Sequence, residues 1–381
     1  DSGCAVAEKL SQYHASVIVL EKSIDLAEGA TKANSGIVHA GYDALPGTLK
    51  AFYNVRGASM FPELCKNYNI PYRQCGALVV ALSDNERATL EGLKKRGEAN
   101  GVKHLSVIDK KDVLALEPNI NPQVVSALYI PDSAIISPYE TAFALADNAA
   151  INGVSFLFEH PVSNVYHDTG LFTVQSGNDF FHCKALINCA GSGAANIHNQ
   201  LSGSELEMIH RRGQYYLLDR PAVLPFSRTV FQCPSIMGKG VLITPTVHGN
   251  LLIGPNAEDI NDPDDTATTA NGLSEVLQKA FRTWPSLSVR QNITNFSGVR
   301  AHLKTDDFIV GQCPDVPGYF EAFGIVSPGL SSAPAIALDL SKQVSDYLHL
   351  VHQETTSVFI APAPSFHDMN NEQRADAVRS D

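Results

Sequence analysis

Apolar residues recur at helical spacing from Ser2 to Tyr13, and a continuous apolar run from Ala15 to Leu20 then ends at the acid Glu21. A helix followed by a buried parallel strand and a carboxylate is typical of the second half of a dinucleotide-binding βαβ unit. In that unit the third glycine of the G-x-G-x-x-G motif begins the helix and allows close packing on the strand. Gly3 occupies this place, so the first strand and the first two glycines are expected upstream of Asp1.

The rest of the chain alternates between strand and helix patterns. The stretch 29–57 is polar, glycine-rich and long for a connection, which indicates an ordered loop that contacts a ligand. The stretch 256–271 is acidic and predicts a surface loop, and 351–381 lacks apolar periodicity and predicts a linker. The pattern predicts helices at 84–100, 138–152, 272–282 and 333–350, and strands at 76–82, 124–130, 154–158, 171–175, 185–189 and 292–298, with antiparallel strands over 213–255.

Length and charge restrict the class of protein. A chain of 381 residues exceeds one compact core, so two lobes are expected. The formal net charge of −12 argues against a general nucleic-acid binder, which needs a basic face. No apolar run approaches the roughly 20 residues of a membrane span, so no transmembrane segment is predicted.

The reactive side chains narrow the chemistry further. The seven cysteines include no C-x-x-C pair, which favours reduced thiols in a cytoplasmic protein over disulfides or a zinc site. No metal site is predicted, and the chain has neither a G-x-S-x-G motif nor a P-loop. Hydrolase and kinase functions therefore have no support.

Six segments, in order along the chain, together resemble the D-amino-acid oxidase/glycerol-3-phosphate dehydrogenase superfamily of FAD enzymes. Its most similar branches are the anaerobic-type glycerol-3-phosphate dehydrogenases and the L-2-hydroxyglutarate dehydrogenases or oxidases. The stretch 327–337 looks most like the first branch, whose members often continue into a cysteine-rich iron–sulfur module; such a module is expected after Asp381. The segments that carry the resemblance are Asn34–Gly41, Pro46–Ala51, Gln74–Ala81, Asn188–Gly191, Gly298–Ala301 and Gly324–Leu330.

The resemblance implies an α/β, two-lobed fold in which an antiparallel-sheet substrate domain is inserted into a Rossmann-like FAD-binding domain. The FAD-binding domain is expected at 1–66, 134–204 and 298–350, and the substrate domain at 67–133 and 205–297.

The resemblance also implies which residues contact FAD. Glu21 would accept hydrogen bonds from the ribose hydroxyls, and the loop from Asn34 to His39 would pass beside the flavin. A helix that begins near Gly329 would direct its N-terminus at the flavin and stabilise negative charge on the reduced ring. The expected cofactor-binding residues are Gly3, Glu21, Lys22, Thr31, Asn34, Ser35, Gly36, Val162, Ala190, Gly191, Gly324, Gly329, Leu330 and Ser331.

Two residues are expected to be catalytic. His39 would accept the proton of the substrate hydroxyl, with flavin contact as the alternative role. Arg300 would hold the substrate's anionic group through its planar guanidinium, with a structural salt bridge to Asp306 or Asp307 as the alternative. Tyr215, Tyr216 and His248 lie on the strands expected to line the substrate cavity, although core packing is an alternative for each. Of the three, Tyr216 and His248 are the expected substrate-binding residues.

The expected function is hydride transfer from a small hydroxylated anion to FAD, with an unknown electron acceptor. Glycerol 3-phosphate is the first candidate substrate, and L-2-hydroxyglutarate or another 2-hydroxy acid is the second. An alternative of another class is a non-catalytic or electron-relay flavoprotein subunit.

Overall fold

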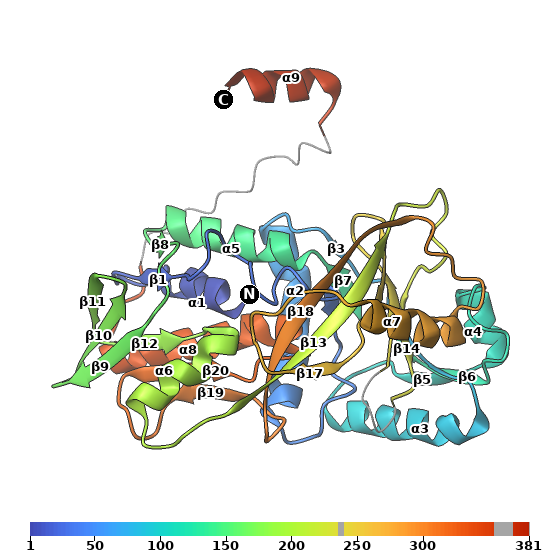
Figure 1. Ribbon diagram of the computed structural model, residues 1–381, viewed down its shortest axis with the longest axis horizontal. Coiled ribbons are helices and arrows are strands. Elements are labelled where there is room, and N and C mark those ends of the chain that lie inside the picture. The colour runs from blue at the N-terminus through green and yellow to red at the C-terminus, as the bar shows by residue number, and fades with distance from the viewer. Residues whose placement is uncertain (235–239, 354–368, 381) are drawn as a thin grey trace.

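The structure is a computed structural model that describes residues 1–234, 240–353 and 369–380. Most helices and strands gather at two ends, and the long strands β13 (Met208–Leu218) and β18 (Asn292–Leu303) run between them (Figure 1). The predicted domain boundary at 298 falls inside β18, one continuous strand. The division into two domains stays a prediction. Under it, β18 contributes residues to both domains.

Two parallel strand pairs lie at the first end. β1 (Ile18–Leu20) pairs with β8 (Ser155–Leu157), and β12 (Leu186–Asn188) pairs with β20 (Tyr319–Phe323), to which β19 (Ile309–Gln312) adds in the antiparallel direction. Every residue of β20 is buried, as in strands covered on both faces. The helices of this end are α1 (Ser2–Leu10), α2 (Leu49–Asn67), α5 (Pro138–Ile151), α6 (Ala194–Leu201) and α8 (Gly329–Leu348), with a short 3-10 turn at Gly191–Gly193.

Two small antiparallel sheets complete this end. One has β10 (Leu171–Ser176) between β9 (Asn164–Asp168) and β11 (Asp179–Cys183). The other has β7 (Ala134–Ile136) between β2 (Ile37–Val38) and β3 (Tyr72–Arg73). The apolar sides of α1, α2 and α8 share one core with residues of β20, so these helices hold the strand ends in fixed positions.

A nine-stranded sheet forms the second end. Its order is β17-β13-β16-β15-β14-β4-β6-β5, with β18 also paired to β13. The helices α3 (Asp84–Ala99), α4 (Lys110–Leu116) and α7 (Ala270–Thr283) lie beside it (Figure 1). The remaining strands are β4 (Ala77–Ala81), β5 (Ser106–Asp109), β6 (Ser126–Ile130), β14 (Thr229–Gln232), β15 (Leu242–Pro245), β16 (Leu251–Gly254) and β17 (Glu258–Ile260).

The sequence predicted an antiparallel sheet in this part of the molecule, but one pair of its strands is parallel. β4 and β14 pair in the parallel direction, and this pair joins the two inserted segments. The two strands are distant along the chain, so no hairpin fixes their relative direction.

One further prediction was wrong, and the assignment of the C-terminal tail as a linker stays a prediction. The loop predicted at 29–57 ends early, because α2 begins at Leu49, where Thr48 caps the helix and the Asp307 carboxylate accepts the N–H groups of Leu49 and Lys50. The tail predicted as a linker contains the helix α9 (Asn371–Ser380), which lies apart from the rest of the molecule (Figure 1). The part of that linker at 354–368 lies outside the described residues.

The cysteines and the helices can be compared with the thiol state and the absence of a transmembrane segment expected from the sequence. All seven cysteines are free thiols. Within the described parts of the chain, no helix combines the length and apolar character needed to cross a membrane.

Candidate active site

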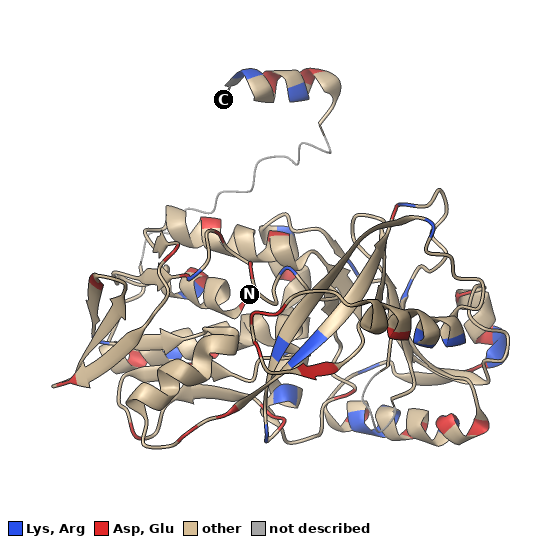
Figure 2. Ribbon diagram, viewed as in Figure 1, with Lys and Arg blue, Asp and Glu red and all other residues tan. Residues whose placement is uncertain are grey.

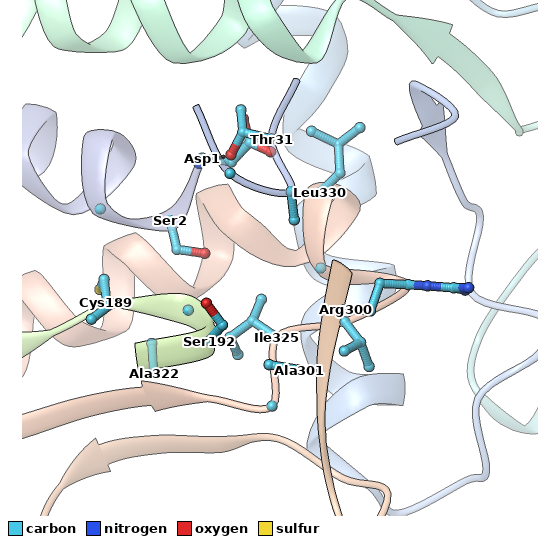
Figure 3. A pocket seen from close by; sticks show the side chains of 18 of the residues that line it. Asp1, Ser2, Thr31, Cys189, Ser192, Arg300, Ala301, Ala322, Ile325 and Leu330 are labelled. Atoms are coloured by element: carbon cyan, nitrogen blue, oxygen red, sulfur yellow. Dashed lines mark hydrogen bonds between the residues drawn. The ribbon is translucent and has the colours of Figure 1, made fainter. Parts of the chain in front are cut away.

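A cavity of about 2170 Å³ extends between the two ends of the molecule. Its walls come from β1 and β12, from the N-termini of α1 and α8, and from the crossing strands β13 and β18. In Figure 3 the Arg300 side chain extends from β18 away from Ser2, Cys189 and Ser192, which lie on the opposite side of the cavity. The cavity is larger than the 300–1,000 Å³ typical of a small-molecule site, and it continues along the open edges of β1 and β12.

Glu21 lies at the end of β1 and lines the cavity. Its Oε1 atom accepts the N–H of Ser23 at 2.9 Å, and its other oxygen has no hydrogen bond from a described residue. Val162, Ala190 and Gly191 line the same region. Lys22 instead pairs with Asp264 at 2.8 Å.

The glycines of this region differ in whether the structure would tolerate a larger residue in their place. A Cβ atom at Gly3 would make an ordinary contact with Cys189 at 3.6 Å, so close packing does not demand glycine there. Gly36 and Gly191 have positive φ angles of 64° and 57°, where side chains are disfavoured. A Cβ at Gly329 would lie 2.8 Å from Ile325, which explains glycine at the start of α8.

The loop before β2 is held by its own side chains. Asn34 donates through Nδ2 to the carbonyl O of Thr31 at 2.8 Å, and its Oδ1 accepts the N–H of Gly36 at 2.8 Å. Thr31 accepts a hydrogen bond from the Asp1 amino group at 2.9 Å. Asn34, Thr31 and Ser35 line the cavity, whereas Gly36 does not. The side-chain amide of Asn34 is therefore used to hold the conformation of the loop.

His39 follows β2 and lines the cavity. Its N–H donates to Ser331 Oγ at 2.7 Å, and its carbonyl O accepts from Asn54 Nδ2 at 2.5 Å. The imidazole packs near the Phe231 ring, with 5.7 Å between centroids. Ser331 is buried in α8 and does not line the cavity, so it contributes by holding the His39 backbone. Asn54 and Phe231 were not predicted from the sequence.

Arg300 is partly buried and lines the cavity, and desolvation lowers the pKa of its guanidinium from the ordinary value. Nη2 donates to the carbonyl O of Asn256 at 3.3 Å, and Arg300 forms no ion pair with any residue that the structure describes. The alternative salt bridge to Asp306 or Asp307 is contradicted, because Asp306 pairs with Lys50 and Asp307 caps α2. A partly desolvated charge without an ion pair is poorly compensated, so the arrangement favours an anionic ligand at Arg300.

Further basic residues surround Arg300. Arg211 lies directly opposite it in the β13–β18 register and makes two hydrogen bonds to Asp259, of 2.6 and 3.0 Å. Arg300, Arg211 and Lys50, together with the histidine His302 between them, all line the cavity, and we call this group the cationic end of the cavity. Figure 2 shows basic segments on the neighbouring strands β13 and β18 beside the acidic strand β17.

His302 lies two residues after Arg300 and is neutral near pH 7. Burial, aided by the charges of Arg300, Arg211 and Lys50, lowers its pKa to about 4. Its Nε2 atom is buried and has no hydrogen-bond partner among the described residues. The imidazole therefore marks a region of positive potential at this wall of the cavity.

The low pKa of His302 predicts a loss of stability in acid. In the unfolded chain histidine binds a proton near pH 6.5, whereas folded His302 does so only near pH 4, so stability falls as the pH decreases between these values. We expect His302→Gln to reduce the loss between pH 7 and pH 5 by about 1–2 kcal/mol. Chemical denaturation of the FAD-loaded protein at both pH values measures this, and equal losses in both proteins would contradict it.

Two predicted substrate residues do not line the cavity. Tyr216 follows Tyr215 on β13 and lies on the opposite face, where it packs against the core of the second end. Tyr215 instead lines the cavity, stacks on Phe296 at 4.8 Å and places its hydroxyl 3.3 Å from Ser35 Oγ. His248 is exposed, and its Nε2 lies 2.8 Å from Glu140 Oε2.

Three side chains of metal-binding types meet beside β20, namely His198, Cys313 and Glu321. Both ring nitrogens of His198 have partners, since Nδ1 lies 2.6 Å from Glu321 and Nε2 lies 2.9 Å from the carbonyl O of Ser204. Burial raises the pKa of Cys313 to about 12, which disfavours the thiolate that binds metals. We interpret the group as a hydrogen-bonded core cluster, and the absence of a metal site stays a prediction.

The cavity fits a dinucleotide in shape and chemistry. It is continuous from the carboxylate of Glu21, past the N-termini of α1 and α8, to His39 and Arg300. Helix N-termini favour anionic groups such as a pyrophosphate. A carboxylate at one end, helix N-termini in the middle and a histidine at the other end are suited to FAD with its flavin beside His39.

Comparisons with known proteins agree with this geometry. The family model for FAD dependent oxidoreductases, called DAO, matches residues 2–343. A glycerol 3-phosphate dehydrogenase of Caloramator mitchellensis is 41% identical over 382 aligned positions, which cover 100% of this chain and 79% of that protein. A mitochondrial L-2-hydroxyglutarate dehydrogenase of Arabidopsis thaliana is 28% identical and covers 88% of this chain, with 80% of its own length matched.

A solved structure is similar as well. The L-alpha-glycerophosphate oxidase of Mycoplasma pneumoniae, solved with FAD bound, aligns with a TM-score of 0.88 at 32% identity, over 93% of this chain and 94% of that one. The predicted resemblance, fold class and cofactor are thereby confirmed. The chain belongs to the DAO family of FAD-dependent oxidoreductases.

Proposed function

We propose that the protein oxidises the hydroxyl-bearing carbon of glycerol 3-phosphate to a carbonyl. The observation that carries the proposal is the partly buried guanidinium of Arg300, which forms no ion pair among the described residues and lies at the cationic end of the cavity. The 41% identity to a glycerol 3-phosphate dehydrogenase supports the same substrate.

Proton transfer and substrate binding are assigned to different residues of the chain. A bound FAD would supply the acceptor for the hydride that leaves the substrate carbon. His39 accepts the hydroxyl proton on its imidazole, and its backbone is held by Ser331 and Asn54 so that the ring keeps its place. Arg300 binds the phosphate oxygens and thereby orients the carbon.

The proposed FAD contacts are those predicted from the sequence that line the cavity. They are supported by their position in its walls and by the fit of the cavity to a dinucleotide. These residues are Gly3, Glu21, Lys22, Thr31, Asn34, Ser35, Val162, Ala190, Gly191, Gly324, Gly329 and Leu330.

L-2-hydroxyglutarate is the second candidate substrate. Its support is the similarity to the Arabidopsis thaliana enzyme of that name, at 28% identity. Arg300 would bind one carboxylate equally well. The cations at this end favour phosphate, which carries both of its negative charges on one group, over a single carboxylate, because Arg211 and Lys50 add to the positive potential at His302, beside Arg300.

An anaerobic absorption experiment tests the proposal. We expect the flavin bands of the purified full-length protein to bleach on addition of sn-glycerol 3-phosphate and to persist with glycerol, which lacks the anion. Bleaching by L-2-hydroxyglutarate alone would replace the first substrate with the second. Flavin bands that no substrate bleaches would instead support a non-catalytic or electron-relay subunit.

We also propose a cytoplasmic location, supported by the seven free thiols. A separate electron acceptor is required to reoxidise the flavin. The resemblance to the glycerol-3-phosphate dehydrogenase branch makes an iron–sulfur module downstream of this chain one candidate.

A further inference from the structure

Lys50 is a buried lysine at the wall of the cavity. Its side chain is 11% exposed, and its Nζ lies 2.6 Å from Asp306 Oδ1. Lysine keeps its charge in such a place only when a counter-ion is near. The pair is asymmetric, because the Asp306 side chain is 78% exposed.

Asp306 lies in the turn after β18 and has a positive φ of 52°. The next residue, Asp307, accepts the N–H groups of Leu49 and Lys50, so this turn is fixed against the start of α2. The Asp306 carboxylate can therefore leave Lys50 for water, while its backbone stays in place, when another anion takes over as the counter-ion of Lys50. An exposed carboxylate loses little hydration in the pair and regains it readily.

His302 connects this pair to Arg300. Its Nδ1 lies 3.9 Å from the same oxygen of Asp306 that Lys50 contacts, and Arg300 is two residues away on the same face of β18. Lys50, Arg300, His302 and Asp306 all line the cavity. The charges of both Arg300 and Lys50 act on His302. An anion bound in the cavity beside His302 would therefore be attracted by both cations and would compete with Asp306 for Lys50.

We propose that Lys50 is a second cation that binds the substrate's anionic group. Asp306 is a displaceable counter-ion, which pairs with Lys50 in the absence of substrate. This inference rests on the proposed function, since it concerns the anion of the same substrate. It explains why the buried member of the pair is the cation and the exposed member is the acid.

The proposal predicts opposite effects from the two halves of one salt bridge. We expect Lys50→Met to raise the dissociation constant of inorganic phosphate and the KM for glycerol 3-phosphate by about 10-fold or more, because a hydrogen bond to a charged group is lost. Asp306→Asn is expected to lower both by about 2- to 5-fold, because the competing charge is removed. Asn tolerates the left-handed backbone at this position, so the turn is preserved.

The measurements use the FAD-loaded protein. Phosphate binding is followed by calorimetry or by the flavin spectrum, without turnover, and KM is measured separately with glycerol 3-phosphate. Lys50→Arg retains the charge and is expected to restore most of the affinity. The exposed pair of Lys304 and Glu207 lies outside the cavity, and Lys304→Met and Glu207→Gln are expected to change neither constant by more than about 2-fold.

A purely structural salt bridge gives a different result. Both Lys50→Met and Asp306→Asn would then lower stability and leave phosphate affinity unchanged or weaken it together, which overturns the proposal. If Lys50→Met does not fold, Asp306→Asn alone still decides the matter, since unchanged or weaker phosphate binding contradicts the idea. A wild-type protein that binds phosphate but does not oxidise glycerol 3-phosphate would contradict the proposed function. It would not contradict the inference that Lys50 binds an anion in competition with Asp306.

Discussion

Replacing Arg300 with methionine is expected to lower kcat/KM for glycerol 3-phosphate by about 10²–10⁴-fold, because two charge-assisted hydrogen bonds of about 1.5–3 kcal/mol each are lost. The unfolding temperature is expected to stay unchanged or to rise. The guanidinium is partly buried, forms no ion pair among the described residues and makes one hydrogen bond of 3.3 Å to a backbone carbonyl, so its desolvation is poorly compensated in the free protein. Steady-state kinetics and thermal unfolding of the FAD-loaded protein measure both quantities.

A control for this prediction is Arg56→Met. Arg56 pairs with Asp339 at 2.6 Å and does not line the cavity. We expect this variant to lose some stability and to retain kcat/KM, which is the reverse of the Arg300 pattern. An Arg300→Met protein with near-normal activity, or with a clear loss of stability, would show that the guanidinium is structural.

Replacing His39 with glutamine is expected to lower kcat by about 10²–10⁴-fold, the usual contribution of a positioned general base. The flavin spectrum is expected to be retained, because the contacts to Ser331 and Asn54 use the backbone of residue 39 and survive the substitution. The acidic limb of the kcat–pH profile is expected to disappear with the imidazole. Anaerobic single-turnover reduction of the flavin isolates the step in which this proton is transferred.

His198→Gln is a control that removes a buried histidine outside the cavity, paired with Glu321 at 2.6 Å. It is expected to destabilise the protein while leaving the rate of flavin reduction within about threefold of wild type. Should His39→Gln reduce its flavin at a similar rate, the proton must leave by another route and His39 would be confined to cofactor contact.

Local patterns predicted the elements whose causes lie within their own sequence. The helices α3 and α5 and the strand β4 were predicted within about two residues of their observed ends, since apolar spacing and the Asn-Gly stops act locally. The start of α2 was missed, because the carboxylate that caps it comes from Asp307, far along the chain. Likewise, the direction of the β4–β14 pair depends on tertiary packing.

The candidate site shows the same limit. Arg300 and His39 were found through motif resemblance, and both line the cavity. Tyr216 was preferred over Tyr215 although strand alternation places them on opposite faces, and the sequence does not say which face borders the cavity. His302 had a usable signal, its place two residues after Arg300, whereas nothing local marks Lys50 as buried.

The parallel pairing of β4 with β14 has a consequence for how the chain folds. During synthesis β4, β5 and β6 emerge long before β14, so the edge of the apolar strand Ala77–Ala81 stays without its partner until the second inserted segment is made. An unpaired apolar edge is prone to join other chains. Non-local pairing of this kind also slows folding. Truncated versions that end before β14 should therefore aggregate, and the yield of intact enzyme should depend on how fast the later segment arrives relative to such association.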